Sequence, residues 1–477
     1  MGATPAAAAT SLTVGRRRAG EFTSQAYVCN VTRMSSHSTD VTHRPPRRRG
    51  TRAAYAPSAA FGAFGIFWGA WGAALPALRT QAGVSEGQLG TALLFVGLGA
   101  LPAMALTGRT VDRYGLRVVA WLLATLAGAG VLITAGAHGM VPLVVGMLVV
   151  GASSGAADVA INTLAGRAEH ATAQPLLTRS HGLFSVGVVV ASLSTGALLG
   201  AGLSLLATFI AVAAVMVVLA VAARLTGASL EAPAHHEVPG ARADARDDLG
   251  AEPSAQGGSG TPKPPQGARG LAGLLRRIGP TSPLFVVGLV AALAYAIENA
   301  HQSWGAVMLT DAFAASPQLA AAAPATFAAT AALARLSLAP LSRSHPAGML
   351  VGGGALATVG SAVLAVAPSI GVALAGLVLA ALGTATLFPT LLSRSLRGAE
   401  PAQHGRATST VAGTAYLGFL LSPAYVGLLA ASSDLRGAML GVAALALVFT
   451  VTAAPISGWA AKRARATRRP AGRAPGR

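Results

Sequence analysis

The chain of 477 residues contains one cysteine, Cys29, and few charged residues. A single cysteine excludes a disulfide within the chain and a metal site built from several thiolates. Charged residues make up 11% of the sequence, whereas soluble domains carry about 25%. No GxxxxGK[ST] phosphate-binding motif occurs, and no set of metal ligands or catalytic triad is evident. The sequence therefore predicts a protein that is not an enzyme, without a cofactor or a bound metal.

Long apolar segments make up most of the chain. Hydrophobic residues account for 53% of the chain, and its mean hydropathy is +0.58. A helix needs about 20 apolar residues to span a bilayer, and the runs are continuous rather than alternating, which argues against a β-barrel. We expect an all-α membrane protein with twelve transmembrane helices. The predicted spans are 55–78, 88–107, 115–136, 140–166, 180–200, 202–224, 283–309, 317–339, 346–367, 369–392, 405–431 and 435–458.

Residues 225–280 separate the first six spans from the last six. This stretch is rich in Pro, Gly, Asp, Arg and Gln, a composition typical of a flexible linker. We expect one six-helix bundle over 55–224 and a second over 281–458. A disordered basic tail is predicted over 1–54, and a second basic tail over 459–477. Such a layout favours a substrate site between the two bundles, near the middle of the membrane.

The formal net charge of +19 is concentrated in the tails. The N-terminal tail has nine Arg against two acids, and the C-terminal tail has seven Lys or Arg and no acid, so each carries +7. Between the spans, Arg79 and Arg436 fall on one side and ten other arginines, Arg335 among them, on the opposite side. The positive-inside rule then places both termini and the linker in the cytoplasm. The charge indicates topology in the cytoplasmic membrane and contact with anionic lipid, not nucleic-acid binding.

A motif of glycines and charges lies between the second and third spans: Gly108-Arg-Thr-Val-Asp112-Arg113-Tyr-Gly115-Leu-Arg117. The two glycines permit a tight turn and a close helix approach, and Asp112 can accept hydrogen bonds at a helix N-terminus. The segment resembles the G-x-x-x-D-R-x-G-x-R signature of the major facilitator superfamily, and the layout of six and six spans agrees. The resemblance implies that these residues form a conformational latch on the cytoplasmic side.

Further segments resemble the fucose-permease-like branch of that superfamily and its uncharacterised bacterial relatives. The resemblance implies a secondary transporter that moves a small polar, sugar- or polyol-like solute by alternating access, coupled to protons, with a functional acid in span four. Ser303 stands where this branch usually has Asp before the Trp. The segments that carry the resemblance are 71–79, 151–162, 180–187, 298–311 and 416–423.

Asp158 lies deep inside the fourth span, where a carboxylate is costly and usually functional. Asp158 and Asn162 are four residues apart and share a helix face. Gly151 and Gly155 form a GxxxG pair that allows another helix to come close, which would remove water from Asp158 and favour its neutral form. We expect Asp158 to carry a coupling proton and Asn162 to contact the substrate. The alternative is a structural Asp bonded to Asn162 or to a neighbouring Ser.

Glu298 is the second acid inside an apolar span, and polar and aromatic residues surround it. His301 and Gln302 follow it at helical spacing, and Trp304 is adjacent. Such donors and acceptors suit sugar hydroxyls, an aromatic face stacks on a sugar ring, and an imidazole can relay protons. We expect Glu298 to take part in proton coupling and in substrate binding, together with His301, Gln302, Trp304 and Trp71. The alternative is a solvated segment near the extracellular end of the span.

Two other functions remain open from the sequence. A proton-driven efflux antiporter for drug-like amphipathic compounds would be favoured by an apolar, Met-rich cavity. A membrane receptor or scaffold that does not transport would need a structured cytoplasmic domain, which the 225–280 linker does not resemble. We expect a monomer, and the sequence leaves the substrate, the direction of transport and the start at Met1 or Met34 open.

Overall fold

The computed structural model describes residues 47–230, 282–397 and 404–466, and all regular structure in these ranges is helical. Most of the predicted tails and linker, with Cys29 and Met34, lies outside the described residues. Their edges are helical: α1 begins at Arg47, α15 continues to Ala466, and the short helix after α6 ends at Leu230. Residues 47–54 and 459–466 therefore extend the first and last helices, contrary to the predicted boundaries of the tails.

The helices follow the predicted spans closely. In the described part of the chain, twelve stretches are long and apolar enough to cross a membrane, judged by length and composition. The pieces α9 with α10, and α12 with α13, each make up one of them. The prediction of an all-α protein with twelve membrane-spanning helices is confirmed. The elements are α1 (Arg47–Ala82), α2 (Glu86–Tyr114), α3 (Arg117–Gly136), α4 (Met140–Thr172), α5 (Leu176–Gly200), α6 (Leu205–Gly227), η1 (Ala228–Leu230), α8 (Pro283–Phe313), α9 (Pro317–Ala320), α10 (Ala322–Ser344), α11 (Pro346–Val366), α12 (Ile370–Thr384), α13 (Leu387–Arg397), α14 (His404–Ser432) and α15 (Leu435–Ala466).

Polar caps and a glycine mark several helix ends. The Ser85 side chain accepts a hydrogen bond from the Gln88 backbone N–H, and the Gln88 side chain accepts one from the Ser85 N–H. This capping box satisfies amides that the first turn of α2 leaves unpaired. Ser204 caps α6 in a related way. Gly115 ends α2 with a φ of +73°, so the predicted tight turn forms there because glycine tolerates this backbone conformation.

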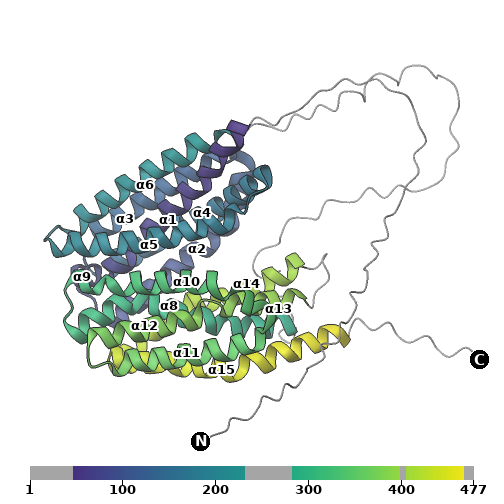
Figure 1. Cartoon of the computed structure of the whole chain (residues 1–477). Coiled ribbons are helices and arrows are strands. Elements are labelled where there is room, and N and C mark those ends of the chain that lie inside the picture. The colour runs from purple at the N-terminus through teal and green to yellow at the C-terminus, as the bar shows by residue number, and fades with distance from the viewer. Residues whose placement is uncertain (1–46, 231–281, 398–403, 467–477) are drawn as a thin grey trace, which may run out of the picture. The chain divides into compact units, whose positions relative to one another are not determined.

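The helices form two groups (Figure 1). Helices α1–α6 make the N-terminal bundle, in which α1 packs against α5 and α6, and α2 against α4. Helices α8–α15 make the C-terminal bundle, in which α8 packs against α14, and α11 against α12 and α15. The bundles meet where α2 packs on α14 and α5 on α10. We call the end where α1 and α8 finish, at Ala82 and Phe313, the packed end, and the end where α1 begins the tail end.

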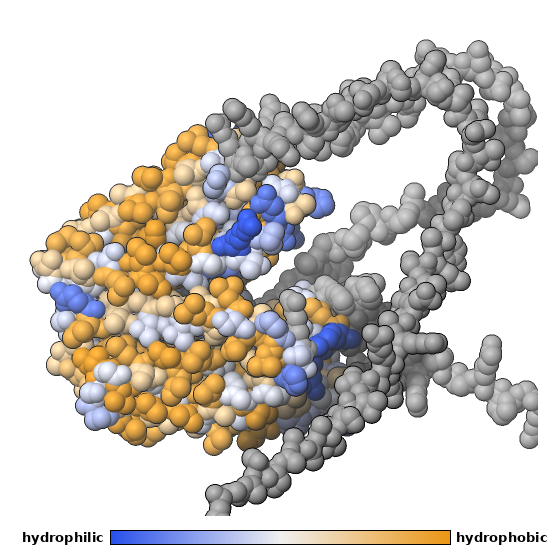
Figure 2. Space-filling model, viewed as in Figure 1, coloured by the Kyte–Doolittle hydropathy of each residue, from blue (hydrophilic) through white to orange (hydrophobic). Residues whose placement is uncertain are grey.

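Large apolar side chains cover the outer surface of the bundles. Val141, Leu132 and Leu225 are among many that are largely exposed, and the space-filling view shows a mostly hydrophobic face with hydrophilic residues gathered towards its ends (Figure 2). Monomeric soluble proteins rarely expose so much contiguous apolar surface. The surface fits the hydrocarbon of a bilayer.

Gly151 and Gly155 allow the close helix contact that was predicted for them, whereas Gly108 does not. A Cβ atom added to Gly151 would overlap the carbonyl O of Val96, and one added to Gly155 would lie 2.7 Å from the carbonyl O of Ala100. The GxxxG pair of α4 therefore packs directly on α2, as expected. Gly108 lies inside α2 with nothing within 4 Å of an added Cβ. Its predicted role in a turn or a close approach is wrong, because α2 continues past it.

Candidate functional site

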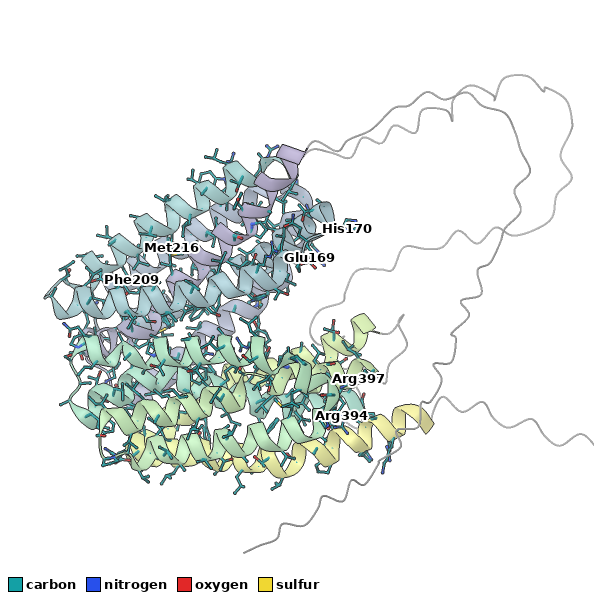
Figure 3. All side chains as sticks on the ribbon, in the orientation of Figure 1. Glu169, His170, Phe209, Met216, Arg394 and Arg397 are labelled. Atoms are coloured by element: carbon teal, nitrogen blue, oxygen red, sulfur yellow. The ribbon has the colours of Figure 1, made fainter. Side chains whose placement is uncertain are left out.

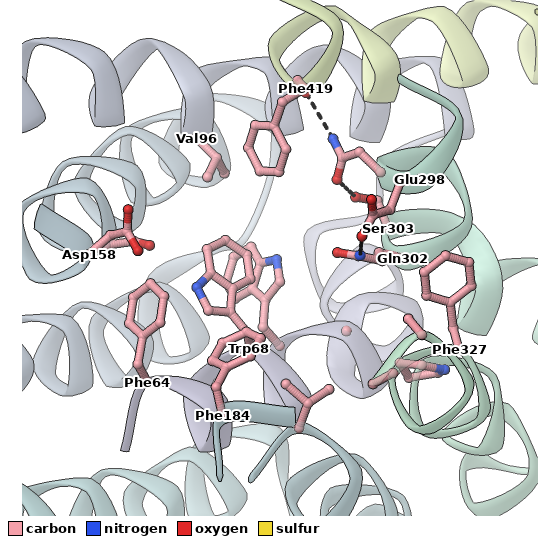
Figure 4. Close-up of a pocket in the computed structure, with 18 of the residues that line it drawn as sticks. Phe64, Trp68, Val96, Asp158, Phe184, Glu298, Gln302, Ser303, Phe327 and Phe419 are labelled. Atoms are coloured by element: carbon pink, nitrogen blue, oxygen red, sulfur yellow. Dashed lines mark hydrogen bonds between the residues drawn. The ribbon is translucent and has the colours of Figure 1, made fainter. Parts of the chain in front are cut away.

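A cavity of about 260 Å³ lies between the two bundles (Figure 4). Its walls come from α1, α2, α4 and α5 of the N-terminal bundle and from α8, α10 and α14 of the C-terminal bundle. This is the position predicted from the arrangement of six and six spans. A ligand here would contact both bundles at once.

Aromatic rings form much of the wall. Trp68 and Trp71 stand on α1 with Phe64 one turn before, and their ring centroids are 6.3 Å (Phe64–Trp68) and 6.4 Å (Trp68–Trp71) apart, both edge to face. Phe184 of α5 packs against Phe64 at 5.8 Å. The predicted contact residue Trp71 therefore lies on the cavity. The other aromatic lining residues are Phe327, Tyr416 and Phe419.

Asp158 reaches the cavity from the N-terminal bundle (Figure 4). The Asn162 side-chain amide donates to the Asp158 carboxylate at 3.1 Å and to the Asp158 carbonyl O at 2.9 Å. Asn162 itself does not line the cavity, because it lies one turn further along α4 and its amide is directed back to Asp158. The structure therefore makes Asn162 a partner of Asp158 in place of the expected substrate contact. Within the described ranges, no cationic side chain pairs with Asp158.

Glu298 faces Asp158 from the opposite wall, within a cluster of polar groups (Figure 4). Arg335 Nη2 donates to the Glu298 carboxylate at 2.7 Å, and Gln302 donates to the same oxygen at 3.1 Å. Arg335 Nε also donates to the carbonyl O of Ala385 at 3.2 Å, which fixes the guanidinium against the end of α12. Glu298 and Gln302, which were predicted to bind the substrate, both line the cavity.

Arg335 was predicted to lie in a loop, and the structure corrects this. Arg335 lies within α10, which continues to Ser344, and its side chain lines the cavity with 46% of its surface exposed. An arginine inside an apolar segment is tolerated where it pairs with an acid in the bundle interior, and Glu298 supplies that acid.

Asn299 and Ser303 also line the cavity and were missed from the sequence. Ser303 donates to the Asn299 side-chain oxygen at 3.1 Å, and the Asn299 amide donates to the carbonyl O of Phe419 at 2.8 Å. The signal was present, since Glu298, Asn299, Gln302 and Ser303 occupy neighbouring positions on one face of a helix. No group of three or more His, Cys, Asp or Glu in the described residues could hold a metal ion.

His301 and Trp304 lie on the far side of α8 from the cavity. Both are 0% exposed, and neither lines the cavity. His301 Nδ1 lies 2.7 Å from the carbonyl O of Ile297, and Nε2 lies 3.2 Å from Ser361 Oγ of α11. At about 100° per residue, the cavity-lining positions 298, 299, 302 and 303 form one side of α8, and positions 301 and 304 lie roughly 130° and 170° from the centre of that side. The structure therefore places these two predicted substrate contacts in the core of the C-terminal bundle.

We expect His301→Ala to lower the stability of the folded protein by about 3 kcal/mol, because it empties a filled core position and leaves Ser361 without its imidazole partner. Gln302→Ala is the matched control on the next residue, whose side chain is exposed to the cavity. It should change stability by about 0.5 kcal/mol or less. Melting temperatures of the two variants in detergent measure the difference. An equal fall for both variants would contradict the core position of His301.

The predicted latch residues lie at the tail end, between α2 and α3. Arg113 is exposed, and its guanidinium sits 5.3 Å from the centroid of the Tyr114 ring. Arg117 begins α3, and Asp112 belongs to the last turn of α2, with its side chain outside the described part. The latch therefore stays a prediction.

Charged residues of both bundles gather at the tail end (Figure 3). Glu169 and His170 mark the end of α4, and Arg394 and Arg397 mark the end of α13. The Glu169 carboxylate accepts a hydrogen bond from the backbone N–H of Leu177 at 2.9 Å. Glu169 therefore holds the turn between α4 and α5 and does not line the cavity.

An ion pair joins the two bundles at the packed end. Arg79 at the end of α1 lies 2.5 Å from the Asp311 carboxylate of α8, and 3.2 Å from the Glu86 carboxylate of α2. From the sequence, Arg79 indicated only the topology of its loop, and its contact with α8 was not predicted.

Backbones also meet between the bundles near this end. A Cβ added to Gly90 of α2 would lie 2.8 Å from the Cα of Gly427 in α14. One added to Gly72 of α1 would lie 3.3 Å from Pro324 of α10. The bundles are therefore in direct contact between the cavity and the packed end.

Known proteins share this fold. No protein-family profile matches the chain. An uncharacterised transporter of the major facilitator type from Yersinia pestis is 26% identical over 396 residues, covering 80% of this chain and 90% of its own length. An uncharacterised transporter from Sinorhizobium fredii is 28% identical over 368 residues, covering 76% and 87%.

Two solved transporter structures share the fold of this chain. An inward-facing, unoccupied bacterial homologue of the human lysosomal transporter Spinster matches with a TM-score of 0.64 at 17% identity, covering 89% of this chain and 99% of its own. A D-xylose–proton symporter matches with a TM-score of 0.61 at 13% identity, covering 84% and 97%. At such identities the structural matches show the fold. Relatives and structural neighbours are transporters and not enzymes, and none singles out the fucose-permease-like branch.

Proposed function

We propose that this chain, a transporter of the major facilitator superfamily and a multi-pass protein of the bacterial inner membrane, moves a small polar solute by alternating access. One observation carries the proposal: the cavity between the bundles has a polar group on each facing wall. Asp158 belongs to the N-terminal bundle, and the Glu298–Arg335 pair to the C-terminal bundle. A solute that spans the cavity couples the positions of the two bundles.

The contacts at the packed end support the alternating-access part of the proposal. The Arg79–Asp311 ion pair and the glycine contacts hold the bundles together on one side of the cavity. Rocking the bundles about the cavity would separate this end and bring the tail ends together. If the charge distribution places the termini in the cytoplasm, the packed end faces outward and this conformation is inward-facing.

Glu298 and Gln302, with Trp71 opposite, supply the proposed solute contacts. A carboxylate, a guanidinium and an amide together offer both donors and acceptors to hydroxyl groups. The neighbouring aromatic faces suit the apolar face of a ring. A sugar- or polyol-like solute therefore fits this wall of the cavity.

Asp158 is the proposed carrier of the coupling proton. Loss of water favours the neutral form of a carboxyl group, and a hydrogen bond from an amide such as Asn162 favours the charged form. Opposing effects of this kind allow a carboxyl group to gain and lose a proton as access to water changes. Glu298 is a weaker candidate for proton coupling than the sequence indicates, because Arg335 pairs with it at 2.7 Å.

We expect Asp158→Asn to abolish solute-driven proton movement, because an amide cannot take up the coupling proton. The measurement uses proteoliposomes that enclose a pH-sensitive dye, to which D-xylose, D-glucose, myo-inositol and their amino derivatives are added in turn. Glu169→Gln is the matched control, since it removes an acid from the same helix outside the cavity. Undiminished proton movement in Asp158→Asn contradicts the proposal, as does its absence in the unmodified protein with every solute.

The aromatic wall supports a second candidate, proton-driven efflux of amphipathic compounds. Seven aromatic side chains line the cavity, with Met104 as its methionine. The cavity is therefore rich in aromatic residues, whereas a Met-rich cavity was expected for such an antiporter. Competition between an amphipathic compound and the sugars in the same proteoliposomes separates the two candidates.

A further inference from the structure

We propose that the solute carries a protonated amine, which Asp158 binds among the aromatic rings of the N-terminal bundle. The inference rests on the proposed function only in taking this cavity as the transport site. It names the chemical class of the solute: a small monovalent organic cation with a ring body and a polar group at its far end.

The charges that line the cavity do not balance. Three charged side chains line it: Asp158, Glu298 and Arg335. Arg335 and Glu298 neutralise each other at 2.7 Å, whereas Asp158 has an uncharged amide as its partner. Ionisable groups in a membrane interior generally pair with an opposite charge. A ligand with one positive charge supplies the missing partner of an ionised Asp158.

The side chains around Asp158 favour an ammonium over a hydroxyl. Phe64 and Trp68 lie on the same side of the cavity as Asp158, with Phe184 next to them (Figure 4). Aromatic faces attract cations by about 0.5–2 kcal/mol each. Apart from Asp158, the lining residues of this bundle with polar side chains that suit hydroxyl groups are Trp68, Trp71, Ser154 and Ser185. An ammonium group would form charge-assisted contacts with both Asp158 and the ring faces of this wall, which a neutral polyol cannot form.

The opposite wall suits uncharged polar groups. Gln302 and Asn299 present amides there, and the Glu298–Arg335 pair presents both donors and acceptors without net charge. An anionic solute would meet a guanidinium that is already paired and a cavity with one negative charge in excess. The cavity volume of about 260 Å³ suits a solute of the size of a small amine.

Three indoles of equal ring size but different charge test the inference. Tryptamine carries an ammonium, indole-3-ethanol a hydroxyl in its place, and indole-3-acetate a carboxylate. Binding of each to the purified full-length protein in lipid nanodiscs is measured by calorimetry. We expect tryptamine to bind at least about tenfold more tightly than indole-3-ethanol, because the Asp158 carboxylate and the ring faces attract an ammonium group. We expect indole-3-acetate to bind most weakly.

Asp158→Asn should bring tryptamine affinity to that of indole-3-ethanol and leave indole-3-ethanol unchanged. Glu169→Gln, on the same helix outside the cavity, should keep the full preference. Should Asp158→Asn fail to fold, judged by its melting temperature, the ranking of the three indoles on the unmodified protein decides.

The inference is overturned if tryptamine binds no better than indole-3-ethanol, which includes binding of neither, or if indole-3-acetate binds best. These outcomes are distinct from failure of the proposed function. Proton movement without an amine preference overturns the amine alone, and an amine preference without any proton movement overturns proton-coupled transport alone.

Discussion

Arg79→Ala is expected to separate the two bundles at the packed end. The substitution removes an ion pair between α1 and α8 whose side chains are 20% and 24% exposed. A pair of such intermediate burial is worth about 1–3 kcal/mol, which changes the ratio of two conformations roughly 5- to 150-fold. Asp311 would remain beside Glu86 without a shared cation, and the two carboxylates would repel each other.

Distances between spin labels measure this change directly. One label at Thr80→Cys and one at Ser316→Cys, both exposed positions of the packed end, report separation in a Cys29→Ser background. A second pair at His170→Cys and Ser393→Cys reports the tail end. In Arg79→Ala we expect the first distance to lengthen and the second to shorten.

Arg436→Ala is the control for loss of an arginine at the same end. The Arg436 guanidinium donates to the carbonyl oxygens of Ala365 and Ala367, so its contacts stay within the C-terminal bundle. Neither label distance should change. Unchanged distances in Arg79→Ala, or an equal change in Arg436→Ala, would show that the ion pair does not hold the bundles together.

Gly151→Ala is expected to lower the stability of the protein by about 3 kcal/mol or more. The new methyl group would overlap the backbone carbonyl of Val96, and a backbone cannot move aside without shifting α2 against α4. Overpacking typically costs about 1–3 kcal/mol and occasionally more. A backbone contact that cannot relax belongs at the upper end of this range or above it. The melting temperature of the purified protein should fall by about 5 °C or more.

Gly166→Ala makes the same change in the same helix at a position with nothing within 4 Å of the new methyl group. It should leave the melting temperature unchanged or raise it, because alanine favours the helix by about 0.5–1 kcal/mol. Similar melting temperatures for the two variants would mean that α4 does not rest on α2 at Gly151.

The sequence predicted the helices well because hydropathy is a local property of the chain. It also drew attention to Asp158 and Glu298, which line the cavity, because acids inside apolar segments are rare. Arg335 was missed for the complementary reason: an arginine near the end of a span looks like a loop residue. Its pairing with Glu298 depends on α10 lying beside α8, which no local pattern reveals.

Helical spacing was less informative about which side of α8 faces the cavity. His301 and Trp304 are polar or aromatic, as a binding residue would be, but α8 is buried on nearly all sides. Ser361 and the Ile297 carbonyl satisfy His301 inside the core. A buried polar side chain with a full set of partners looks the same in sequence as one that waits for a ligand.

The contact between Gly90 and Gly427 has a kinetic consequence. At this contact the backbone of α2 meets the backbone of α14 with no side chain between them. Interlocked leucines would have to change rotamer, or leave transient voids, each time one helix rolled over the other. Two glycines require neither, so this contact adds little to the activation barrier for the motion. In the proposed alternating-access cycle, the barrier to opening the packed end then lies in the Arg79–Asp311 ion pair and not in this contact.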